Sequence, residues 1–561
     1  MERLRGVDRR QPAALTRLRD SAPPALLGLA LAAAAAVLFS YGFHLTYFQD
    51  SWEFLMNRRD PTSAALLEPH NEHIVLIPVA IDQLLLRIFG MGSMVPDLVV
   101  LIVLLLGTAT LVFVYVRRRL GPWPALFAAV VLLFLGPAWQ DLLWPFQSGF
   151  VGSALFGVAM LLALEAEDRR GDPWACAFLA LSIGFSSLGL AFVAAAAVDV
   201  LRGHRRRGWR RSWVFAAPLL LYLVWYAGWG HEAANHVSSH NVLVSPRFVV
   251  EGLTASLDSL LALATIADEA IGRSQWGLPL LLVLVCLIGY AVARGRRVDP
   301  RVWPAAAAAA AFWFLAAFNE IPGREAYTSR YLYVGALFGI LLLANLLAGI
   351  RFPRWALPVA AALTAVIVGF NLVPLREGRD FFRAETKLTR ADLGAIEIAR
   401  RTVAPSFTLP PEISGSNFLN EIEAGEYLQA VDEYGSPAYS PRDLSAAPEA
   451  DRKQADLVLA NALPLEIEAE AEPAPRSRRC VAVPGGVTAP ALELGPGTTF
   501  VELAPGQPGA IRLRRFASPE YPLSSEGILG GSTTRLVIPA DLAPQPWRLR
   551  VEASQGARVC R

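Results

Sequence analysis

The chain has 561 residues, of which 54% are hydrophobic and 18% charged, and its mean hydropathy is +0.39. This composition excludes an ordinary soluble protein of this length and indicates an integral membrane protein. The net charge of +2 is close to neutral, and arginine gathers in short clusters between apolar runs, so the charges favour membrane topology signals over a nucleic-acid partner.

The N-terminal segment predicts a retained membrane anchor. Residues 1–22 are rich in arginine, and the apolar stretch 23–43 has no small-residue cleavage site of a removable signal peptide. A stretch of about 20 apolar residues is long enough to cross the hydrocarbon core of a bilayer. We therefore predict a cytosolic basic N-terminus, followed by the first crossing of the plasma (inner) membrane.

Further apolar stretches predict a polytopic helical domain over 23–374. Some are short, which is acceptable where a helix is broken or shielded by its neighbours. The expected crossings, about eleven with the first, are 23–43, 97–116, 122–137, 150–165, 174–186, 188–201, 212–229, 276–293, 303–318, 329–350 and 355–374.

The arginine clusters fix an orientation for these crossings. Clusters begin at positions 117, 167, 202, 294 and 351, and the positive-inside rule places all of them in the cytosol. This requires a helix break near GFSSLG within 174–201, and it requires the apolar stretch 74–90 to lie along the surface without crossing. An odd number of crossings from a cytosolic N-terminus then leaves the C-terminus outside.

The composition changes after Pro374. Residues 375–475 predict an amphipathic helix followed by an acidic, loop-rich connector, and 476–561 contain short β-branched stretches separated by Pro and Gly, which predict a small β-sandwich. Cys480 and Cys560 bracket this β-rich domain. A disulfide between them is reasonable in an extracytoplasmic domain, and it would join the first strand to the last.

The predicted outward loop 44–96 is unusually rich in titratable side chains. Asp50 and Glu53 come soon after the first crossing, and the sequence EPHNEH follows at 68–73. Two other outward connections, AWQDLLWPFQSG at 138–149 and NEIPGREAYTSR at 319–330, hold further polar and aromatic residues. These loops are the expected position of chemistry at the outer membrane surface.

This layout resembles the polytopic glycosyltransferases that use polyprenyl-phosphate sugars, known as the GT-C class. Members have a first outward loop with two helices along the membrane, an acidic residue soon after the first crossing, many further crossings and sometimes an outward soluble domain. Here SWEFLMNRR and IVLIPVAIDQLLLRIF match the two surface helices, and the resemblance covers roughly 23–374. It implies sugar transfer from a polyprenyl-phosphate donor to an envelope glycan, lipid or protein acceptor.

Asp50 is the candidate general base. Transfer from a lipid phosphate sugar needs a carboxylate to take the proton of the acceptor hydroxyl, and the resemblance gives the acidic residue at this place that role. The alternative is structural: Asp50 caps the helix that begins at SWEF, with Glu53 completing a capping box. One residue can do both.

EPHNEH supplies candidate binding groups. His70 and His73 would share a face if the segment were helical, with Glu72 beside them. Imidazole can hold a phosphate oxygen, and histidine with carboxylate can bind a divalent cation, which some GT-C enzymes use. The alternative is a solvated helix start after Pro69, and the metal requirement stays open.

Arg324 and Arg330 are the candidate partners of the leaving phosphate. A guanidinium binds phosphate bidentately, and arginine is unusual in outward connections. Tyr331 and Glu53 are further candidate substrate-binding residues. The alternative for Arg330 and Tyr331 is an interfacial anchor, because arginines and aromatic residues are common at the ends of membrane helices. Trp144 and Gln147 can stack on and hydrogen-bond a sugar, but aromatic belt residues have the same pattern.

Other readings are weaker. HEAANHVSSH at 231–240 lacks the four-residue histidine spacing of a metalloprotease helix. A transporter or flippase of lipid-linked sugars would need charges deep within several crossings, and most predicted crossings have none. A non-catalytic envelope protein that binds glycan through its β-rich domain would need fewer crossings. We therefore expect a membrane glycosyltransferase whose partners are donor lipid, acceptor and membrane lipids.

Overall fold

The structure is a computed structural model, and its contacts divide the chain into two units. The first comprises Met1–His44, Asp60–Gln83 and Val95–Asp380, and the second comprises Leu45–Arg59, Leu84–Met94 and Phe381–Arg561. The residues that it describes are 13–166, 170–202, 208–234, 236–263, 276–296, 298–350, 352–353, 355–414, 419–484, 491–504, 509–517, 521–522, 533–553 and 555–561.

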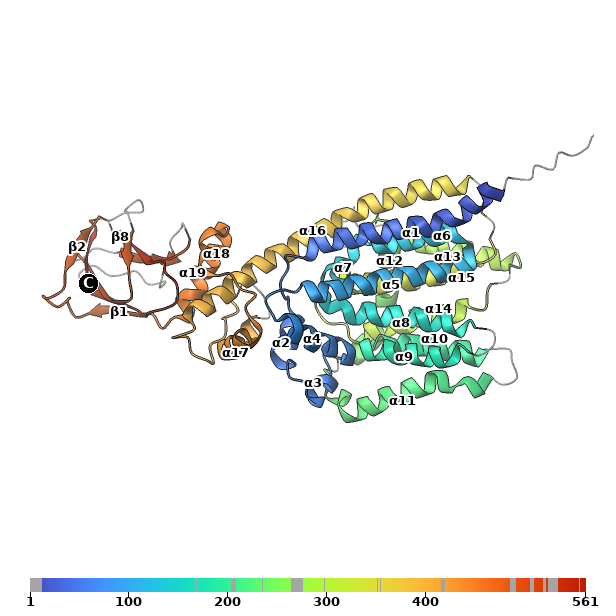
Figure 1. Cartoon of the computed structure of the whole chain (residues 1–561), viewed down its shortest axis with the longest axis horizontal. Coiled ribbons are helices and arrows are strands. Elements are labelled where there is room, and N and C mark those ends of the chain that lie inside the picture. The colour runs from blue at the N-terminus through green and yellow to red at the C-terminus, as the bar shows by residue number, and fades with distance from the viewer. Residues whose placement is uncertain are drawn as a thin grey trace, which may run out of the picture. The chain divides into compact units, whose positions relative to one another are not determined.

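Apolar helices make up most of the first unit, and many of them run side by side in Figure 1. Close packing joins α8 to α9, α5 to α6 and α10 to α14. The helices are α1 (Ala13–Gly42), α3 (Ser63–Leu67), α5 (Val95–Leu120), α6 (Pro122–Leu133), α7 (Trp139–Leu143), α8 (Ser148–Leu164), α9 (Asp172–Phe185), α10 (Gly189–Arg202), α11 (Trp213–Gly228), α12 (Ser239–Leu260), α13 (Gly277–Ala293), α14 (Val302–Phe318) and α15 (Ser329–Leu346). Two more, α4 (Leu76–Phe89) and α16 (Ala356–Ala399), contribute residues to both units.

Several of these helices are long and apolar enough to cross a bilayer. In the described part of the chain, five helices have the length and the hydropathy that a membrane span requires. The bent pair Pro122–Leu133 and Gly136–Leu143 adds a sixth if the two helices form one span. The five are Ala22–Gly42, Val95–Leu120, Pro145–Leu164, Ser329–Leu346 and Ala356–Ala399. The chain is therefore a multi-pass membrane protein, as its composition predicts.

Each apolar stretch predicted to cross coincides with a helix. The break predicted near GFSSLG is also present, because α9 ends at Phe185 and α10 begins at Gly189. The backbone N–H of Ser186 donates to the Ser182 carbonyl, and that of Gly189 donates to the Ser186 carbonyl. The count of about eleven crossings and their orientation stay predictions.

Residues 230–275 connect two expected crossings, and the sequence predicts a long outward loop there; helix α12 occupies Ser239–Leu260, so that expectation is wrong. Ser238 caps its first turn by accepting a hydrogen bond from the backbone N–H of Asn241 at 3.1 Å. Its buried face carries small residues, and a Cβ on Gly252 would lie 2.3 Å from the ring of Trp313 on α14. Small residues let membrane helices approach closely, so α12 packs against α14 and α15.

The connector predicted as loop-rich is also more ordered than expected. Helix α16 continues through Pro374 to Ala399, where the sequence predicts two separate helices. Beyond it, α17 (Ala424–Tyr434), α18 (Pro441–Ala446) and α19 (Glu449–Ala462) occupy the segment that was expected to be mainly loop. The first strand begins at Glu466, ten residues before the predicted start of the β-rich domain at 476.

Two antiparallel sheets form the C-terminal part of the second unit. Their strand orders are β1-β7-β4-β9-β2 and β3-β8-β5-β6. Side chains alternate as a half-buried strand requires, and β8 buries Trp547, Leu549 and Val551. The strands are β1 (Glu466–Ala471), β2 (Cys480–Val483), β3 (Leu492–Leu494), β4 (Gly497–Leu503), β5 (Gly509–Arg514), β6 (Tyr521–Pro522), β7 (Thr533–Ile538), β8 (Trp547–Ala553) and β9 (Ala557–Cys560).

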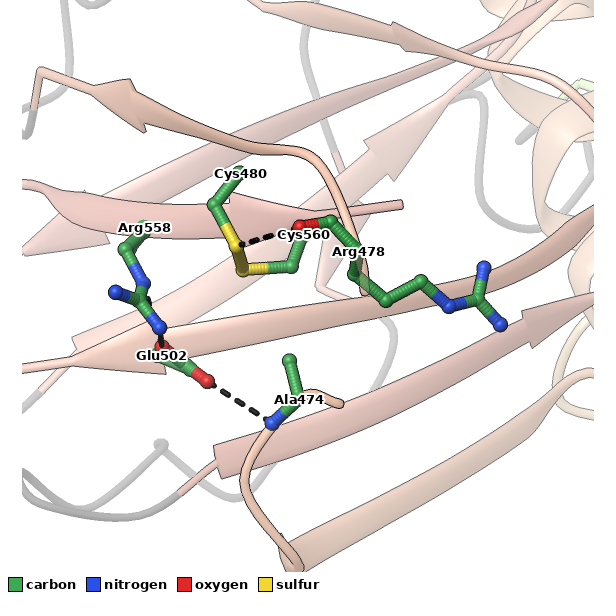
Figure 2. Close-up of a disulfide and its surroundings, with 6 residues drawn as sticks. All are labelled: Ala474, Arg478, Cys480, Glu502, Arg558 and Cys560. Carbon is green, nitrogen blue, oxygen red and sulfur yellow. Dashed lines mark hydrogen bonds and ion pairs between the residues drawn. A yellow bond between two sulfur atoms is a disulfide. The ribbon is translucent and has the colours of Figure 1, made fainter. Parts of the chain in front are cut away.

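The predicted disulfide is present. Cys480 and Cys560 are directly opposite each other on the paired strands β2 and β9, and their sulfur atoms are bonded (Figure 2). The bridge therefore joins an edge strand of the five-stranded sheet to its neighbour. Arg558 on β9 donates to Glu502 on β4 at 2.8 Å beside it.

Candidate functional site

A tight turn, not a helix, presents the first candidate residues. The backbone N–H of His70 donates to the His73 carbonyl at 3.0 Å, and that of His73 donates to the His70 carbonyl at 2.9 Å. Asn71 between them has φ of 50°, a left-handed conformation that asparagine tolerates well. The expectation that His70 and His73 share a helical face is therefore wrong.

Ser187 fastens this turn to the break between α9 and α10. The Ser187 hydroxyl accepts from the backbone N–H of Ile74 at 3.1 Å and donates to the Glu72 carbonyl at 3.3 Å. Upstream, the Trp225 indole donates to the Leu67 carbonyl at 2.7 Å. Side chains of two neighbouring helical segments thus position the turn.

Glu72 and Arg324 form a direct ion pair, although 252 residues separate them in the sequence. Arg324 Nη1 lies 2.9 Å from Glu72 Oε1 and 2.8 Å from Oε2. The side chains are 20% and 13% exposed respectively. Among the described residues, both side-chain hydrogen bonds of this guanidinium come from Nη1, and Nε and Nη2 form none.

His73 lies beside this pair. Its Nε2 is 3.6 Å from Glu72 Oε1, its ring packs edge-on against Phe150 at 5.3 Å, and its buried Nδ1 has no hydrogen-bond partner among the described residues. Burial lowers the pKa of His73 below its ordinary value of 6.5; Glu72 opposes this shift, and the cations Arg324 and Arg330 reinforce it. His73 is therefore neutral at neutral pH and can accept a hydrogen bond.

Glu72 is held in its charged form. Burial alone would raise the pKa of this carboxyl, but His73 and Arg324 together lower it below its ordinary value. Because His73 is neutral at neutral pH, Arg324 is the partner that maintains the charge there. The site at pH 7 therefore contains one carboxylate, one guanidinium and one neutral imidazole.

A cavity of about 310 Å³ adjoins this group, and its lining belongs entirely to the first unit. Glu72 and His73 contribute polar groups, Tyr331 lies at the start of α15, and Leu315 and Phe312 from α14 add apolar surface. The sequence-based reasoning missed several other lining residues, among them Ser187, Tyr222, Tyr226, His231 and Asn319. The predicted helix break near GFSSLG could have pointed to Ser187, because polar residues at a break can face a cavity. The tyrosines of α11 have the same sequence pattern as ordinary residues of a membrane helix.

Arg330 lies near this group without joining the ion pair. Its Nη2 donates to the Gly323 carbonyl at 2.7 Å, and its backbone N–H donates to Gln140 Oε1 at 3.2 Å. Asp141, which the sequence reasoning did not single out, is fully buried close by on α7. Arg330 thus holds the loop that carries Arg324.

The predicted sugar-binding residues are buried beneath the turn. Trp144 is 2% exposed, Gln147 4% and His70 4%, and none of the three lines the cavity at Glu72. The Phe146 ring stacks on Trp144 at 5.1 Å and meets the His70 ring edge-on at 5.1 Å. The Trp144 and Phe146 rings therefore pack against the turn through His70.

Asp50 and Glu53 belong to the second unit. Asp50 is the first residue of α2 (Asp50–Asn57), and the N-cap position belongs to Gln49, whose side chain makes no capping hydrogen bond, so the predicted capping by Asp50 is wrong. Glu53 pairs with the buried Arg58 at 3.2 Å. The catalytic role of Asp50 stays a prediction. No group of three or more metal-binding side chains occurs among the described residues.

Comparisons with known proteins give two structural likenesses. No protein-family model and no curated protein matches the chain. The crystal structure of ArnT from Cupriavidus metallidurans bound to undecaprenyl phosphate is 13% identical, covering 79% of this chain and 96% of its own, with a TM-score of 0.46. The apo ArnT structure is 15% identical, covering 80% and 93%, with a TM-score of 0.44. Both likenesses are distant, and neither assigns a role to a residue of this chain.

Proposed function

We propose that the chain is an integral membrane glycosyltransferase that moves a sugar from a polyprenyl-phosphate donor to an extracytoplasmic cell-envelope acceptor. The observation that carries the proposal is Arg324, whose Nε and Nη2 form no hydrogen bond with the described residues, while Nη1 is fixed by Glu72. A guanidinium held in place by one nitrogen can bind a phosphate with the others, and this arrangement needs no reorganisation when the ligand arrives.

The adjoining cavity suits the rest of a donor of this kind. Tyr222, Tyr226 and Tyr331 present aromatic surface that can pack against a sugar, and Leu315 and Phe312 supply apolar surface for the start of a prenyl chain. A mostly apolar pocket with a few convergent polar groups is the usual form of a small-molecule site. Neutral His73 can accept a hydrogen bond from a sugar hydroxyl.

The reaction breaks one bond and forms one bond at the anomeric carbon. The acceptor hydroxyl oxygen attacks this carbon, the bond from carbon to phosphate oxygen breaks, and polyprenyl phosphate leaves with its electron pair. In our proposal Asp50 takes the hydroxyl proton, as the sequence resemblance suggests. Arg324 stabilises the negative charge that grows on the departing phosphate.

A transfer assay tests the proposal. Purified protein in lipid nanodiscs is given radiolabelled polyprenyl-phosphate sugars and an envelope extract, and transfer is compared between wild type, Asp50→Asn and Asp60→Asn. Loss of the base should reduce the rate by about 10²-fold or more. Asp60→Asn is the matched control, because this exposed aspartate comes from the same predicted loop.

Three outcomes contradict the proposal in different ways. Normal transfer by Asp50→Asn removes Asp50 from the mechanism. No transfer from any donor, with labelled lipid changing leaflets in vesicles, identifies a transporter. Glycan binding that disappears after deletion of 376–561, again without transfer, identifies a non-catalytic binding protein.

A further inference from the structure

A second cavity of the first unit, about 200 Å³ in volume, is separate from the proposed transfer site. It lies between the C-terminal ends of α5, α8 and α10 and the N-terminal end of α14. The cavity at Glu72 lies towards the other ends of two of these helices, because Leu190 of α10 and Leu315 of α14 line it. The charged and aromatic residues that line the second cavity are Tyr115, Arg119, Glu165, Asp199 and Arg301.

Arg119 and Glu165 are already bonded to other parts of the protein. Glu165 accepts hydrogen bonds from Arg119 and, at 2.7 Å, from Arg118. Arg119 also donates to Asn345 at 2.6 Å, and its guanidinium covers the Tyr115 ring at 3.4 Å. These residues therefore form a fixed wall of the cavity.

Asp199 and Arg301 are the two charged lining groups that stay open. Asp199, near the end of α10, forms no hydrogen bond or ion pair with the described residues. The backbone N–H of Arg301 donates to Asp299 at 2.9 Å, but its guanidinium forms no hydrogen bond in the described part of the chain. Arg211 also attracts Asp199, but its Nε and Nη2 are bonded to Asp172. The cavity thus offers one open carboxylate and one open guanidinium.

We propose that this cavity binds a phosphoethanolamine group, with the ammonium at Asp199 and the phosphate at Arg301. The lining contains two carboxylates and two guanidiniums, so a ligand with one charge of each sign leaves the cavity neutral. An ammonium donates hydrogen bonds to a carboxylate, and a guanidinium binds phosphate bidentately. A simple anion would place a like charge beside Asp199, and a simple cation would do so beside Arg301.

The aromatic surface of the cavity disfavours a quaternary ammonium such as choline. Proteins usually hold such groups in cages of several aromatic rings. Among the described lining residues Tyr115 is the only aromatic one, and Arg119 covers its ring. A primary ammonium, which donates hydrogen bonds, therefore fits this cavity better than a trimethylammonium group.

The cavity lies at the ends of apolar helices, where lipid headgroups are expected. Helices α5, α8, α10 and α14 pack side by side (Figure 1). Trp303, in the first turn of α14, is 49% exposed, and Arg202 at the end of α10 lies over its ring at 4.6 Å. Tryptophan and arginine at helix ends are typical of the membrane interface. A phospholipid is therefore the expected source of the phosphoethanolamine group, and this inference does not depend on the proposed sugar transfer.

Lipid binding by the full-length protein tests the proposal. Purified protein in detergent is titrated with phosphatidylethanolamine, phosphatidylcholine or phosphatidylglycerol of the same acyl chains, and bound lipid is measured by native mass spectrometry. We expect the wild type to prefer phosphatidylethanolamine. Soluble glycerophosphoethanolamine should displace this lipid, and inorganic phosphate should displace it much less, because phosphate lacks the ammonium. Comparing the soluble compound with the lipid shows whether the acyl chains add to the affinity.

Two single variants should change the lipid preference in different ways. Asp199→Asn and Arg301→Gln should each weaken phosphatidylethanolamine binding by about tenfold or more, since each removes a charge-assisted hydrogen bond. Anionic phosphatidylglycerol should bind more tightly to Asp199→Asn, which lacks a like charge, and less tightly to Arg301→Gln. The control is Arg294→Gln, which removes an exposed arginine outside the cavity and should leave the binding of all three lipids unchanged.

Four results would overturn the proposal. They are equal binding of the three lipids by the wild type, unchanged phosphatidylethanolamine binding in both variants, displacement by inorganic phosphate as strong as by glycerophosphoethanolamine, and a uniform loss of all three lipids in both variants. The third would mean a site for anions alone. The fourth, with a lower unfolding temperature, would assign both residues a structural role. If Asp199→Asn fails to fold, Arg301→Gln applies the test by itself, because Arg301 is exposed.

Discussion

Two arginine–glutamate pairs in the first unit differ in how many nitrogens of the guanidinium form hydrogen bonds within the protein. Arg119, with a side chain 2% exposed, donates from Nε to Asn345 at 2.6 Å, from Nη1 to the Tyr115 carbonyl at 2.9 Å and from Nη2 to Glu165. Arg324 donates to Glu72 from Nη1 alone, within the described part of the chain. Each pair adjoins a cavity, of about 200 Å³ at Glu165 and about 310 Å³ at Glu72.

This difference gives a criterion that distinguishes a structural ion pair from a candidate ligand site: whether the protein itself bonds every nitrogen of the guanidinium. The Arg119 guanidinium is bonded at all three nitrogens and also lies over the Tyr115 ring at 3.4 Å, and Asn345 donates in turn to the Tyr115 hydroxyl. Such a network is closed, and its role is to hold helices together. The Arg324 pair is open, and a phosphate can complete it.

The largest expected effect is on stability, at the closed network. Arg119→Gln removes the buried guanidinium of the network and leaves Glu165 with only the exposed Arg118 as partner, so we expect a loss of about 3 kcal/mol in the free energy of unfolding. Unfolding in detergent by denaturant titration measures it. Arg118→Gln is the control: Arg118 pairs with the same Glu165 but is 47% exposed, so its loss should stay below about 1 kcal/mol. Equal losses would show that the network is not closed around Arg119.

The next effect is on activity, at the open pair. Arg324→Gln should reduce sugar transfer by about 10²-fold, since it removes a group that stabilises the leaving phosphate, with a smaller effect on stability than Arg119→Gln. Arg247→Gln is the control, because Arg247 also pairs with a glutamate, Glu251, but is 73% exposed. If Arg324→Gln destabilises the protein as much as Arg119→Gln and transfers sugar normally, the two pairs have the same structural role.

Acid should weaken the open pair and the turn that carries it. The native pKa values of His73 and Glu72 both lie below their ordinary values of 6.5 and 4.5, so as the pH falls the unfolded chain binds protons before the native chain does. Stability from His73 is therefore complete above about pH 6.5 and is lost as the pH falls towards its native pKa; Glu72 follows at lower pH.

Unfolding free energies at pH 7.5 and 5.5 measure this effect. His73→Gln should make them more nearly equal than in the wild type. His231→Gln should leave the difference unchanged, because His231 lines the same cavity but its side chain is 55% exposed. A wild-type protein that gains stability between pH 7.5 and 5.5 would contradict the expected sign.

The smallest effect is on positioning. Ser187→Ala removes the hydroxyl that bonds the Ile74 N–H and the Glu72 carbonyl, so we expect transfer to fall by about fivefold, equivalent to about 1 kcal/mol. Ser245→Ala is the control, since that buried hydroxyl bonds within α12 and does not line the cavity. Equal activity of Ser187→Ala and wild type would mean that the turn needs no external support.

The membrane helices could be predicted because a bilayer imposes a simple pattern, a run of apolar residues of fixed length. Helix α12 escaped this pattern because close packing against Trp313 and α15 is achieved with Gly252, Ala255 and Ser259, which are small and weakly apolar. Likewise, α17 to α19 are short, and neither length nor hydropathy distinguishes them from loop.

The sequence predicts which residues belong to the candidate site, but it does not predict how their side chains are arranged. Glu72, His73 and Arg324 were identified from their residue types and their position near predicted crossings. Their pairing joins residues 252 apart, which no local pattern encodes. A three-residue histidine spacing fits a helix and a turn alike, and only the positive φ of Asn71 decides between them.

The turn from His70 to His73 is closed by two main-chain hydrogen bonds. Its shape is therefore independent of the imidazole rings, so either histidine can be exchanged without moving the carboxylate of Glu72. In such a turn the backbone sets the position of the Glu72 charge. The side chains on either side of Glu72 can therefore be substituted without moving that charge. Substrate preference can then evolve through single substitutions, with no need to rebuild the site.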